Sequence, residues 1–228
     1  MTAGTWREVP GVLHSWDLST GVDGPGTRFV AFLAGCPLRC LYCQNPDTWH
    51  IGDGSPTDAG RVIDRATRYR SFTARGGGLT LSGGEPLRQP AFAEALLTGA
   101  KGAGLHTALD TSGFLGARAS DALLAHTDLV LLDIKSWNPD TYRRLTGVAL
   151  KPTLAFAERL AGLGVPMWIR FVLVPGLTDD PANVAGVADV VATLPTVERV
   201  DVLPFHRLGA GKYGELGLAY PCGDTGAP

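Results

Sequence analysis

The sequence predicts an α/β protein whose sheet is made of six parallel strands. Two observations lead to this fold class. Six short apolar runs alternate along the chain with segments of helical pattern. The runs are apolar almost throughout rather than at every second residue, which is typical of parallel strands buried on both faces. Six such repeats with short connections form either a doubly wound sheet or a partial (β/α) barrel.

The elements follow one another in a regular order. The predicted strands are the apolar runs, which cover residues 27–35, 78–84, 105–113, 128–136, 165–176 and 198–206. The predicted helices lie between them, over residues 57–71, 90–103, 116–125, 139–145, 153–163 and 180–194. No linker, low-complexity tract or strict repeat interrupts this order. We therefore expect a single domain over residues 1–228, with a Gly-rich C-terminal tail at 209–228.

Composition limits the classes of function. The chain is 45% hydrophobic, which is ample for a core, and its net charge of -2 gives no basic field for nucleic acid. The N-terminus has no signal-peptide pattern, and the longest apolar run, 129–132, is far too short to span a membrane. We expect a cytoplasmic protein without nucleic-acid or membrane partners. In that reducing compartment, clustered cysteines are ligands or redox groups rather than disulfides.

Polar residues gather just after the ends of the predicted strands. In parallel barrels the active site is built at this rim from several such loops, so a single site is the economical explanation. The residues concerned are Cys36 after the first strand, Ser82, Gly83, Gly84 and Glu85 after the second, Asp110 and Thr111 after the third, Asp133 and Lys135 after the fourth, and His206 after the sixth.

The stretch "GCPLRCLYCQNPDTW", residues 35–49, holds three of the four cysteines of the chain. Cys36, Cys40 and Cys43 follow a Cys-x3-Cys-x2-Cys spacing, which is not a packing pattern. A structural zinc site needs a fourth ligand, and His50 does not complete a paired motif. The remaining interpretation is an iron–sulfur cluster with three thiolate ligands and one open iron, which marks a reactive centre.

With an aromatic residue, Tyr42, before the last cysteine, this motif resembles the signature of the radical S-adenosylmethionine (radical SAM) enzymes. The resemblance implies a partial (β/α)6 TIM-like barrel of the radical SAM type. It also implies that Cys36, Cys40 and Cys43 bind a [4Fe–4S] cluster, whose open iron S-adenosylmethionine chelates through its amino and carboxylate groups. One electron from the cluster then releases a 5'-deoxyadenosyl radical.

Three further motifs fit this resemblance, although each has a plain structural alternative. "SGGEP", residues 82–86, is by itself an ordinary turn between a strand and a helix. "LLDIKSW" holds Lys135, which is either a partner for the carboxylate of the cofactor or a solvated rim lysine. "LPFHRLG" holds His206, and a lone histidine is more often structural. The resemblance implies that the cofactor is bound by Tyr42, Cys43, Gln44, Gly83, Gly84, Glu85, Asp110, Asp133, Ile134, Lys135 and His206.

The resemblance covers nearly the whole chain and is to the glycyl-radical-enzyme activating family, of the pyruvate formate-lyase type. It rests on "VDGPGTRFVAFLAGCPLRCLYCQNPDTW", "GGGLTLSGGEPL", "LHTALDTSGF", "DLVLLDIKSWNPDTYRRLTG", "WIRFVLVPGLTDD" and "VLPFHRLGAGKY". Such enzymes abstract one hydrogen atom from a backbone glycine of a partner enzyme. The implied partners are pyruvate formate-lyase (formate C-acetyltransferase), an enzyme of anaerobic glucose metabolism, and an electron donor such as reduced flavodoxin.

Three alternatives stay open at this point. The chain could activate another glycyl radical enzyme, act on a small molecule by the same radical chemistry, or be a non-enzymatic iron–sulfur electron carrier. Other activating enzymes of the superfamily carry a cysteine-rich, ferredoxin-like region soon after the cluster motif. Here "NPDTWHIGDGSPTDAGRV" has no cysteine, and Cys222 alone cannot hold a second cluster. This favours the short, pyruvate formate-lyase type.

Two further hypotheses concern charged residues. Asp23 and Arg170 are candidates for peptide binding, although Arg170 could instead form a buried ion pair. Asp110, Thr111 and Asp133 offer oxygen ligands for a hard cation, such as a monovalent ion, because Lys135 alone supplies too little positive charge for these acids and the carboxylate of the cofactor. The alternative is that one of the acids caps the following helix. The tail departs from the family pattern, which continues with a final helix, and we expect it to cover the last strand poorly.

Overall fold

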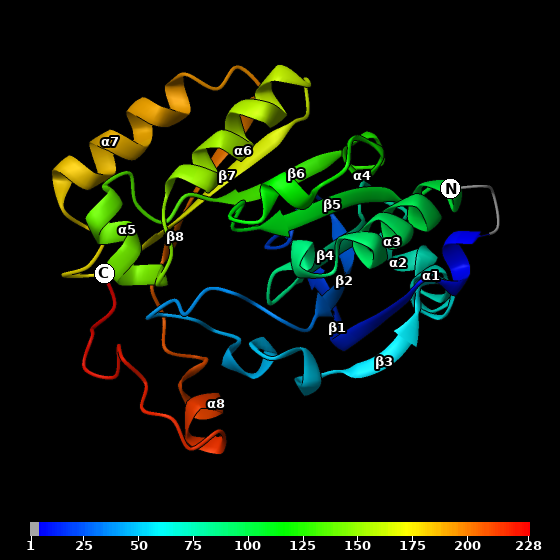
Figure 1. Ribbon diagram of the computed structural model, residues 1–228, viewed down its shortest axis with the longest axis horizontal. Helices are drawn as coiled ribbons and strands as arrows, with labels where there is room; N and C mark the ends of the chain where they lie inside the picture. The colour runs from blue at the N-terminus through cyan, green and yellow to red at the C-terminus, as the bar shows by residue number, and fades with distance from the viewer. Residues whose placement is uncertain (1–4) are drawn as a thin grey trace.

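The computed structural model describes residues 5–228 and contains one open, eight-stranded sheet (Figure 1). Its strand order is β3-β1-β2-β4-β5-β6-β7-β8, and from β2 to β8 all neighbours are parallel. The six parallel strands are β2 (Thr27–Leu33), β4 (Gly78–Gly83), β5 (His106–Thr111), β6 (Leu129–Asp133), β7 (Met167–Leu173) and β8 (Val197–Pro204). All six predicted strands are therefore confirmed. The sheet does not close, which agrees with a partial barrel.

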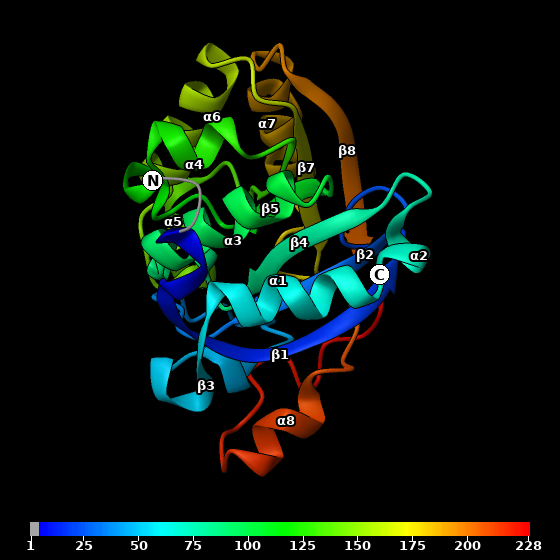
Figure 2. The same cartoon turned by 90° about the vertical axis from the view of Figure 1, so that its right-hand side faces the viewer.

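Two strands were not predicted from the sequence. β1 (Pro10–Thr20) pairs antiparallel with β2, and β3 (Ser55–Asp58) pairs antiparallel with β1. Together they extend the sheet beyond β2. Figure 2 shows β1 curving beneath the body of the molecule, with β3 beside it and α8 below.

The helices lie along the outside of the curved sheet (Figures 1 and 2). The α-helices are α1 (Ala59–Arg68), α2 (Arg70–Thr73), α3 (Pro90–Gly102), α4 (Asp121–Ala125), α5 (Pro139–Thr146), α6 (Lys151–Gly162), α7 (Pro181–Ala192) and α8 (Ala210–Glu215). Short 3-10 helices are η1 (Thr5–Glu8), η2 (Pro46–Thr48), η3 (Ile51–Asp53), η4 (Pro86–Arg88) and η5 (Gly116–Arg118). Of these α-helices, α8 was not predicted. The single helix predicted over residues 57–71 was wrong in its bounds, because residues 57–58 pair in β3 and the rest divides at Tyr69 into α1 and α2. No helix among residues 5–228 is long and apolar enough to cross a bilayer.

Local sequence explains how the helices begin beside the rim. Asn138 caps α5 by accepting hydrogen bonds from the backbone N–H groups of Asp140 and Thr141, and Pro139 occupies the first turn. The helix ends at Gly147, whose φ of 78° is the left-handed conformation that glycine adopts easily. This places the C-terminal end of α5 against the cysteine loop.

The two faces of the parallel strands differ in character. One face carries residues such as Phe29, Leu79 and Ile169, which pack with the helices in the main hydrophobic core. The alternate residues point into the barrel, where Ala108, Leu129 and Leu131 form a small apolar cluster with Trp168 packed against it. Nearer the C-terminal ends of the strands the inward positions become polar: Ser82, Asp110, Asp133 and Arg170. The apolar cluster thus forms the floor of a polar pocket at the rim.

Candidate active site

The cysteine loop, residues 35–49, leaves β2 and is held closed by its own backbone. The N–H of Gly35 donates to the carbonyl of Thr48 at 2.8 Å, and the N–H of Cys36 donates to that of Trp49 at 2.9 Å. The far side of the loop rests on α5, because the N–H of Leu41 donates to the carbonyl of Leu145 at 2.9 Å. The position of the three cysteines is therefore fixed from two sides.

Gly83 and Gly84 allow the end of β4 to approach this loop directly. A Cβ on Gly84 would lie 2.5 Å from the carbonyl oxygen of Gly35, and Gly83 has a φ of +110°. The N–H of Glu85 donates to the same carbonyl of Gly35 at 2.9 Å. The glycine pair is therefore needed for packing of the loop against β4, whether or not a ligand binds there.

Glu85 is buried and does not line the pocket, contrary to what its expected role in cofactor binding implies. Its carboxylate accepts hydrogen bonds from the hydroxyls of Thr111 and Ser112, at 2.7 and 2.6 Å, and from the backbone N–H groups of Ser112 and Leu87. Burial raises the pKa of Glu85, and these four donors act in the opposite direction. Glu85 therefore ties the loop after β4 to the end of β5.

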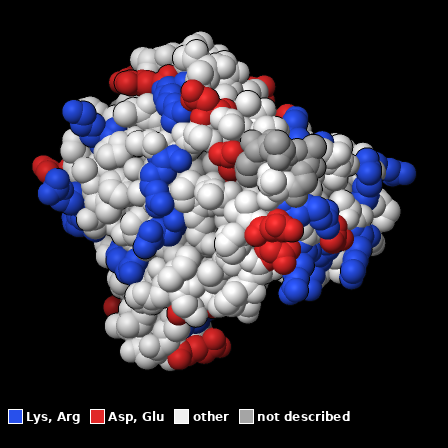
Figure 3. Space-filling model, turned by 45° about the vertical axis from the view of Figure 1, so that its right-hand side comes forward, with Lys and Arg blue, Asp and Glu red and all other residues white. Residues whose placement is uncertain are grey.

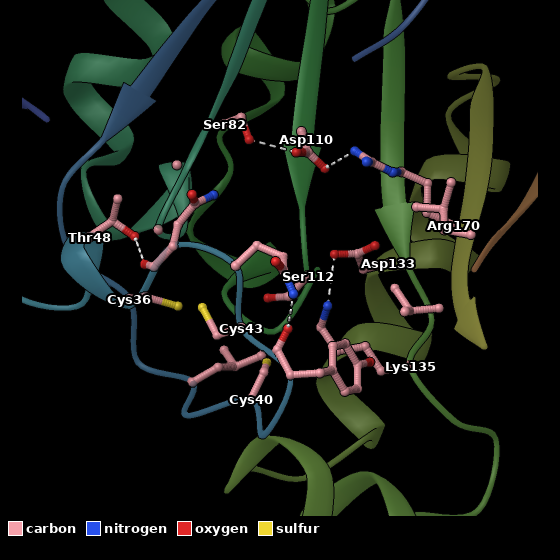
Figure 4. A pocket seen from close by; sticks show the side chains of 18 of the residues that line it. Cys36, Cys40, Cys43, Thr48, Ser82, Asp110, Ser112, Asp133, Lys135 and Arg170 are labelled. Carbon is pink, nitrogen blue, oxygen red and sulfur yellow. Dashed lines mark hydrogen bonds and ion pairs between the residues drawn. The ribbon is translucent and has the colours of Figure 1, made fainter. Parts of the chain in front are cut away.

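Two ion pairs lie next to each other in the pocket (Figure 4). Asp110 is 3.1 Å from the guanidinium of Arg170 and accepts a hydrogen bond from Ser82 at 2.6 Å. Asp133 accepts from the Nζ of Lys135 at 2.8 Å. The register brings the pairs together, because Asp133 lies opposite Arg170 and Asp110 opposite Leu131 in neighbouring strands. The Arg170–Asp110 contact is the buried ion pair that was the alternative to peptide binding.

The pocket environment shifts the pKa values of these groups in different directions. Burial raises the pKa of Asp110 to about 6, although Arg170 opposes this change. Burial also opposes ionisation of Asp133, but the charges of Lys135 and Arg170 more than offset it and lower the pKa of Asp133. Asp110 raises the pKa of Arg170, which therefore stays charged. The pocket thus holds two fixed positive charges beside two acids of different strength.

These groups share one cavity of about 250 Å³ with the three cysteines. Of the predicted cofactor-binding residues, those that line it are Tyr42, Cys43, Gln44, Gly83, Gly84, Asp110, Asp133, Lys135 and His206. Glu85 and Ile134 do not line it, and Ile134 lies in the main core. Asp23 lies outside the lining as well, although its charge contributes to raising the pKa of Arg170.

The cysteines fit a cluster better than a single metal ion. Among residues 5–228, no three His, Cys, Asp or Glu side chains converge as ligands of one ion would, whereas each thiolate of a cubane cluster binds a different iron. Burial raises the pKa of all three thiols, and that of Cys40 rises to about 11 although Lys135 acts against this change. Cluster binding must therefore release protons. The described cysteines form no disulfide.

The oxygen atoms of Asp110, Thr111 and Asp133 are largely engaged by other side chains, so few of them are free to bind a hard cation. The hydroxyl of Thr111 donates to Glu85, and one oxygen each of Asp110 and Asp133 is engaged by a basic side chain. Arg170 also supplies one of the two positive charges that the sequence argument counted as missing. The alternative that either acid caps the following helix is not borne out, because Asn138 caps α5 and Ser120 caps α4.

The C-terminal tail contacts the cysteine loop, which sequence reasoning missed. The side chain of Gln44 accepts from the N–H of Gly209 at 2.8 Å and donates to the carbonyl of His206. Lys212 contacts the side chains of Asn45 and Asp47, at 2.9 and 3.1 Å. The only signal in the sequence was the short "GKYGEL" segment, whose two apolar or aromatic residues are too few to predict a packed helix.

Two aromatic residues complete this contact. The hydroxyl of Tyr213 donates to the carbonyl of Cys43 at 3.3 Å, and its ring meets Trp49 edge-on with centroids 5.9 Å apart. A hydrogen bond from the side chain of Trp49 to Cys43 favours the thiolate, against the stronger effect of burial. The tail therefore supports the loop at the last cysteine.

The chain is similar to known proteins along most of its length. Residues 30–185 match the model of the radical SAM superfamily. It is 45% identical to a pyruvate formate-lyase-activating enzyme of Listeria monocytogenes over 97% of this chain and 92% of that protein. It is 44% identical to the enzyme of that name from Streptococcus mutans, over 95% of this chain and 85% of that protein.

Solved structures show the same fold. A domain of pyruvate-formate lyase-activating enzyme from Bacteroides vulgatus superposes with a TM-score of 0.54 at 28% identity, over 63% of this chain and 97% of that domain. Streptococcus suis SuiB, bound to the precursor peptide SuiA, superposes with a TM-score of 0.62 at 16% identity, over 75% of this chain and 37% of SuiB.

Proposed function

This chain belongs to the radical SAM superfamily and, within it, to the pyruvate formate-lyase-activating enzymes, and on that premise we propose which of its residues carry the activity. The protein activates pyruvate formate-lyase by generating a glycyl radical on it. A [4Fe–4S] cluster and S-adenosylmethionine, when bound, supply the 5'-deoxyadenosyl radical that removes the hydrogen atom. The observation that carries the proposal is that the three cysteines share one cavity with the Asp133–Lys135 and Asp110–Arg170 pairs.

Cys36, Cys40 and Cys43 hold the cluster, and Cys222 does not. The three ligands lie in one loop on the cavity wall, whereas the Cys222 thiol is buried and directed at the carbonyl of Leu41, 3.5 Å away. Replacing Cys222 with Ser should leave the iron content of the reconstituted protein unchanged, and replacing any one of the other three should lower it. Loss of iron from the Cys222→Ser variant would contradict this assignment.

Lys135 and the backbone of Gly83 and Gly84 bind the amino-acid end of the cofactor. Lys135 is 8% exposed and donates one hydrogen bond to Asp133, so the other two protons of its ammonium group are available to a carboxylate. Burial works against its charge, yet Asp133 and the other acids around it raise the pKa of Lys135 well above its usual value. Lys135 therefore remains a cation in the pocket at neutral pH.

Tyr42, Gln44 and His206 lie around the same cavity. The hydroxyl of Tyr42 is buried and has no hydrogen-bond partner among residues 5–228, which is costly unless a ligand or water supplies one. His206 is exposed at the mouth and can contact the remote part of the cofactor. If the cofactor forms a hydrogen bond with this hydroxyl, the Tyr42→Phe variant should bind the cofactor more weakly while the free protein keeps its stability.

The glycine segment of the partner enters the cavity beside Arg170. The apolar floor of Ala108, Leu129 and Leu131 leaves the rim as the approach, and the same floor keeps water away from the reacting carbon. Arg170 is held by Asp110 and can offer its remaining N–H groups to peptide carbonyls. Asp23 acts through its charge on Arg170 rather than by lining the cavity.

A monovalent cation beside Asp110, Thr111 and Asp133 is a further part of the proposal, and it enters only with the carboxylate of the cofactor. Lys135 and Arg170 already balance the two acids, so the third negative charge is the one that recruits it. The affinity for S-adenosylmethionine should then differ between sodium and potassium, and Asp110→Asn should reduce that difference. Binding that is equal in both salts and in tetramethylammonium would exclude the cation.

The proposed setting is a reducing cytoplasm, where the four free cysteines are stable and a carrier such as reduced flavodoxin supplies the electron. The test is anaerobic cluster reconstitution, reduction and addition of S-adenosylmethionine with pyruvate formate-lyase. A glycyl doublet in the electron paramagnetic resonance spectrum, together with 5'-deoxyadenosine, is the expected result. 5'-Deoxyadenosine without the doublet would indicate another substrate, and neither product would indicate an electron carrier.

A further inference from the structure

Three exposed arginines form a row that ends at the cysteine loop. Arg118 donates from its guanidinium to the carbonyl of Arg88 at 3.2 Å, so the two are neighbours. The stem of Arg88 packs on Gly35, where a Cβ would lie 3.0 Å from the Cγ of Arg88. Arg39 lies in the loop itself, between Cys36 and Cys40. We call Arg39, Arg88 and Arg118 the arginine row.

The arginine row carries unbalanced positive charge. None of its three members has a carboxylate within ion-pair distance among residues 5–228, whereas Arg159, beyond its far end, is paired with Asp121 at 2.6 Å. Basic side chains form a row on the face of the molecule seen in Figure 3, and most carboxylates of that face lie outside it. The net charge of the whole chain is -2, so this basic character is local.

The row lies outside the cavity. None of its members lines the pocket in which cofactor and substrate glycine meet. Arg39 holds the outer side of the loop, because its guanidinium donates to the carbonyls of Cys36 and Leu38, both at 2.8 Å, and stacks over Trp49. The row therefore leads from the surface to the backbone of the cysteine loop without entering the cavity.

We infer that the arginine row is the docking surface for the protein that delivers the electron, a one-electron carrier with an acidic surface. The inference rests on the proposed function, because each cleavage of S-adenosylmethionine consumes one electron from outside. The carrier is oxidised by one electron and the cluster is reduced by the same electron. Unpaired positive charge beside the loop attracts an acidic carrier and raises the rate of encounter, and docking there brings its redox group next to the loop that carries the three cysteines.

The double variant Arg88→Glu/Arg118→Glu tests this inference with reduced flavodoxin as the probe. Arg39 is left in place, because it holds the loop carbonyls. At low ionic strength the rate of cluster reduction by flavodoxin should fall by about tenfold or more, since charge reversal turns attraction into repulsion. The difference from the original protein should shrink in high salt. Reduction by photoreduced deazariboflavin, a small donor, should keep its rate.

The matched control is Arg68→Glu/Arg75→Glu, which makes the same change of charge at exposed positions next to α2. Flavodoxin should reduce the cluster of this control variant at the same rate as the cluster of the original protein. Calorimetric binding of oxidised flavodoxin to the cluster-free chain gives a second readout, and the first double variant alone should weaken it.

Each other outcome has a definite meaning. Equal slowing by both double variants, or slowing with deazariboflavin as well, would overturn the inference. So would a loss of glycyl-radical formation with deazariboflavin as donor while reduction stays normal, because the row would then bind the substrate protein. If the original protein, reduced by deazariboflavin, forms no 5'-deoxyadenosine, the proposed function itself is wrong, whatever the variants do.

Discussion

At the scale of single residues, Glu85 shows how a motif residue can serve a site without lining it. The Glu85→Gln change replaces a carboxylate that accepts four hydrogen bonds with an amide that has one acceptor oxygen. We expect a loss of about 1–3 kcal/mol in the free energy of unfolding. Denaturant titration of the cluster-free protein measures it, with Glu94→Gln, a surface carboxylate on α3, as the control. Unchanged stability with weakened cofactor binding would mean that Glu85 contacts the cofactor instead.

The Arg170–Asp110 pair allows a second residue-scale prediction. Arg170→Met leaves Asp110, whose side chain is 16% exposed, without its basic partner, which should destabilise the free protein by up to about 3 kcal/mol. Adding Asp110→Leu should recover much of that loss, because the double variant removes the uncompensated charge. Denaturation of the two variants provides the comparison. A double variant less stable than Arg170→Met would show that Asp133, rather than Asp110, is the main partner.

These residue roles mark the limit of what the sequence could predict. The cysteine spacing predicted that Cys36, Cys40 and Cys43 come together, because all three lie within one local loop, and they do line one cavity; that they are the cluster ligands stays a prediction. The partners of Glu85 and Arg170 could not be predicted, because they depend on which side chains neighbouring strands bring opposite each other. A resemblance to a family assigns roles by motif, and it placed Glu85 and Ile134 at the cofactor although neither lines the cavity.

At the scale of elements, predictability followed apolar sequence more closely than burial. β2, β4, β5 and β6 are buried on both faces and could be predicted from their continuous apolar runs. β7 buries only every second residue and β8 is largely exposed, yet their apolar runs predicted them as well. β1 has a half-buried pattern in which Trp16 and Leu18 alternate with polar residues, and it begins with Pro-Gly, a signal for a turn. β3 is only four residues long, and Ser-Pro begins it. Both strands are set by pairing at the edge of the sheet rather than by their own sequence.

The C-terminal tail also differs from what the sequence predicted, because it packs against the cysteine loop and supports it. Gly209 lies so close to Gln44 that an added Cβ would be 2.8 Å from the Cα of Gln44, whereas nothing lies within 4 Å of a Cβ on Gly211. Gly209→Ala should therefore displace α8 from the loop and speed the bleaching of the reconstituted cluster in air several-fold. Absorbance decay measures this, and trypsin should cleave at Lys212 sooner. Gly211→Ala is the control, and equal bleaching of both variants would contradict the role of the tail.

At the scale of the whole molecule, one end of the barrel is open and the other is closed. The rim holds charged groups around an open cavity. The other end, at the start of β2, β4 and β5, is closed by Arg28, which is fully buried. Its guanidinium donates to the hydroxyl of Thr80, to the carbonyl of Leu79 and to the Nδ1 of His106. A single sheet runs between the two ends of the barrel. That the chain forms one domain stays a prediction.

The closed end makes stability depend on pH in a definite direction. Arginine can only donate, so the Nδ1 of His106 must accept and its ring must be neutral in the folded state. Burial and the charge of Arg28 lower the pKa of His106 below its usual value of 6.5. The unfolded chain therefore binds a proton at a higher pH than the folded chain. The contribution of His106 is complete above pH 6.5 and is lost as the pH falls from there through the folded pKa.

His106→Gln isolates this effect, because glutamine can still accept from Arg28 and does not titrate. Acids such as Asp110, whose pKa burial raises to about 6, act in the opposite direction, and both proteins contain them. The free energy of unfolding of the original protein minus that of His106→Gln should therefore decrease as the pH falls below 6.5 and stay constant above it. Denaturation of the cluster-free proteins between pH 5 and pH 8 measures it. A difference that does not change across this range would mean that His106 accepts a proton while Arg28 keeps its place.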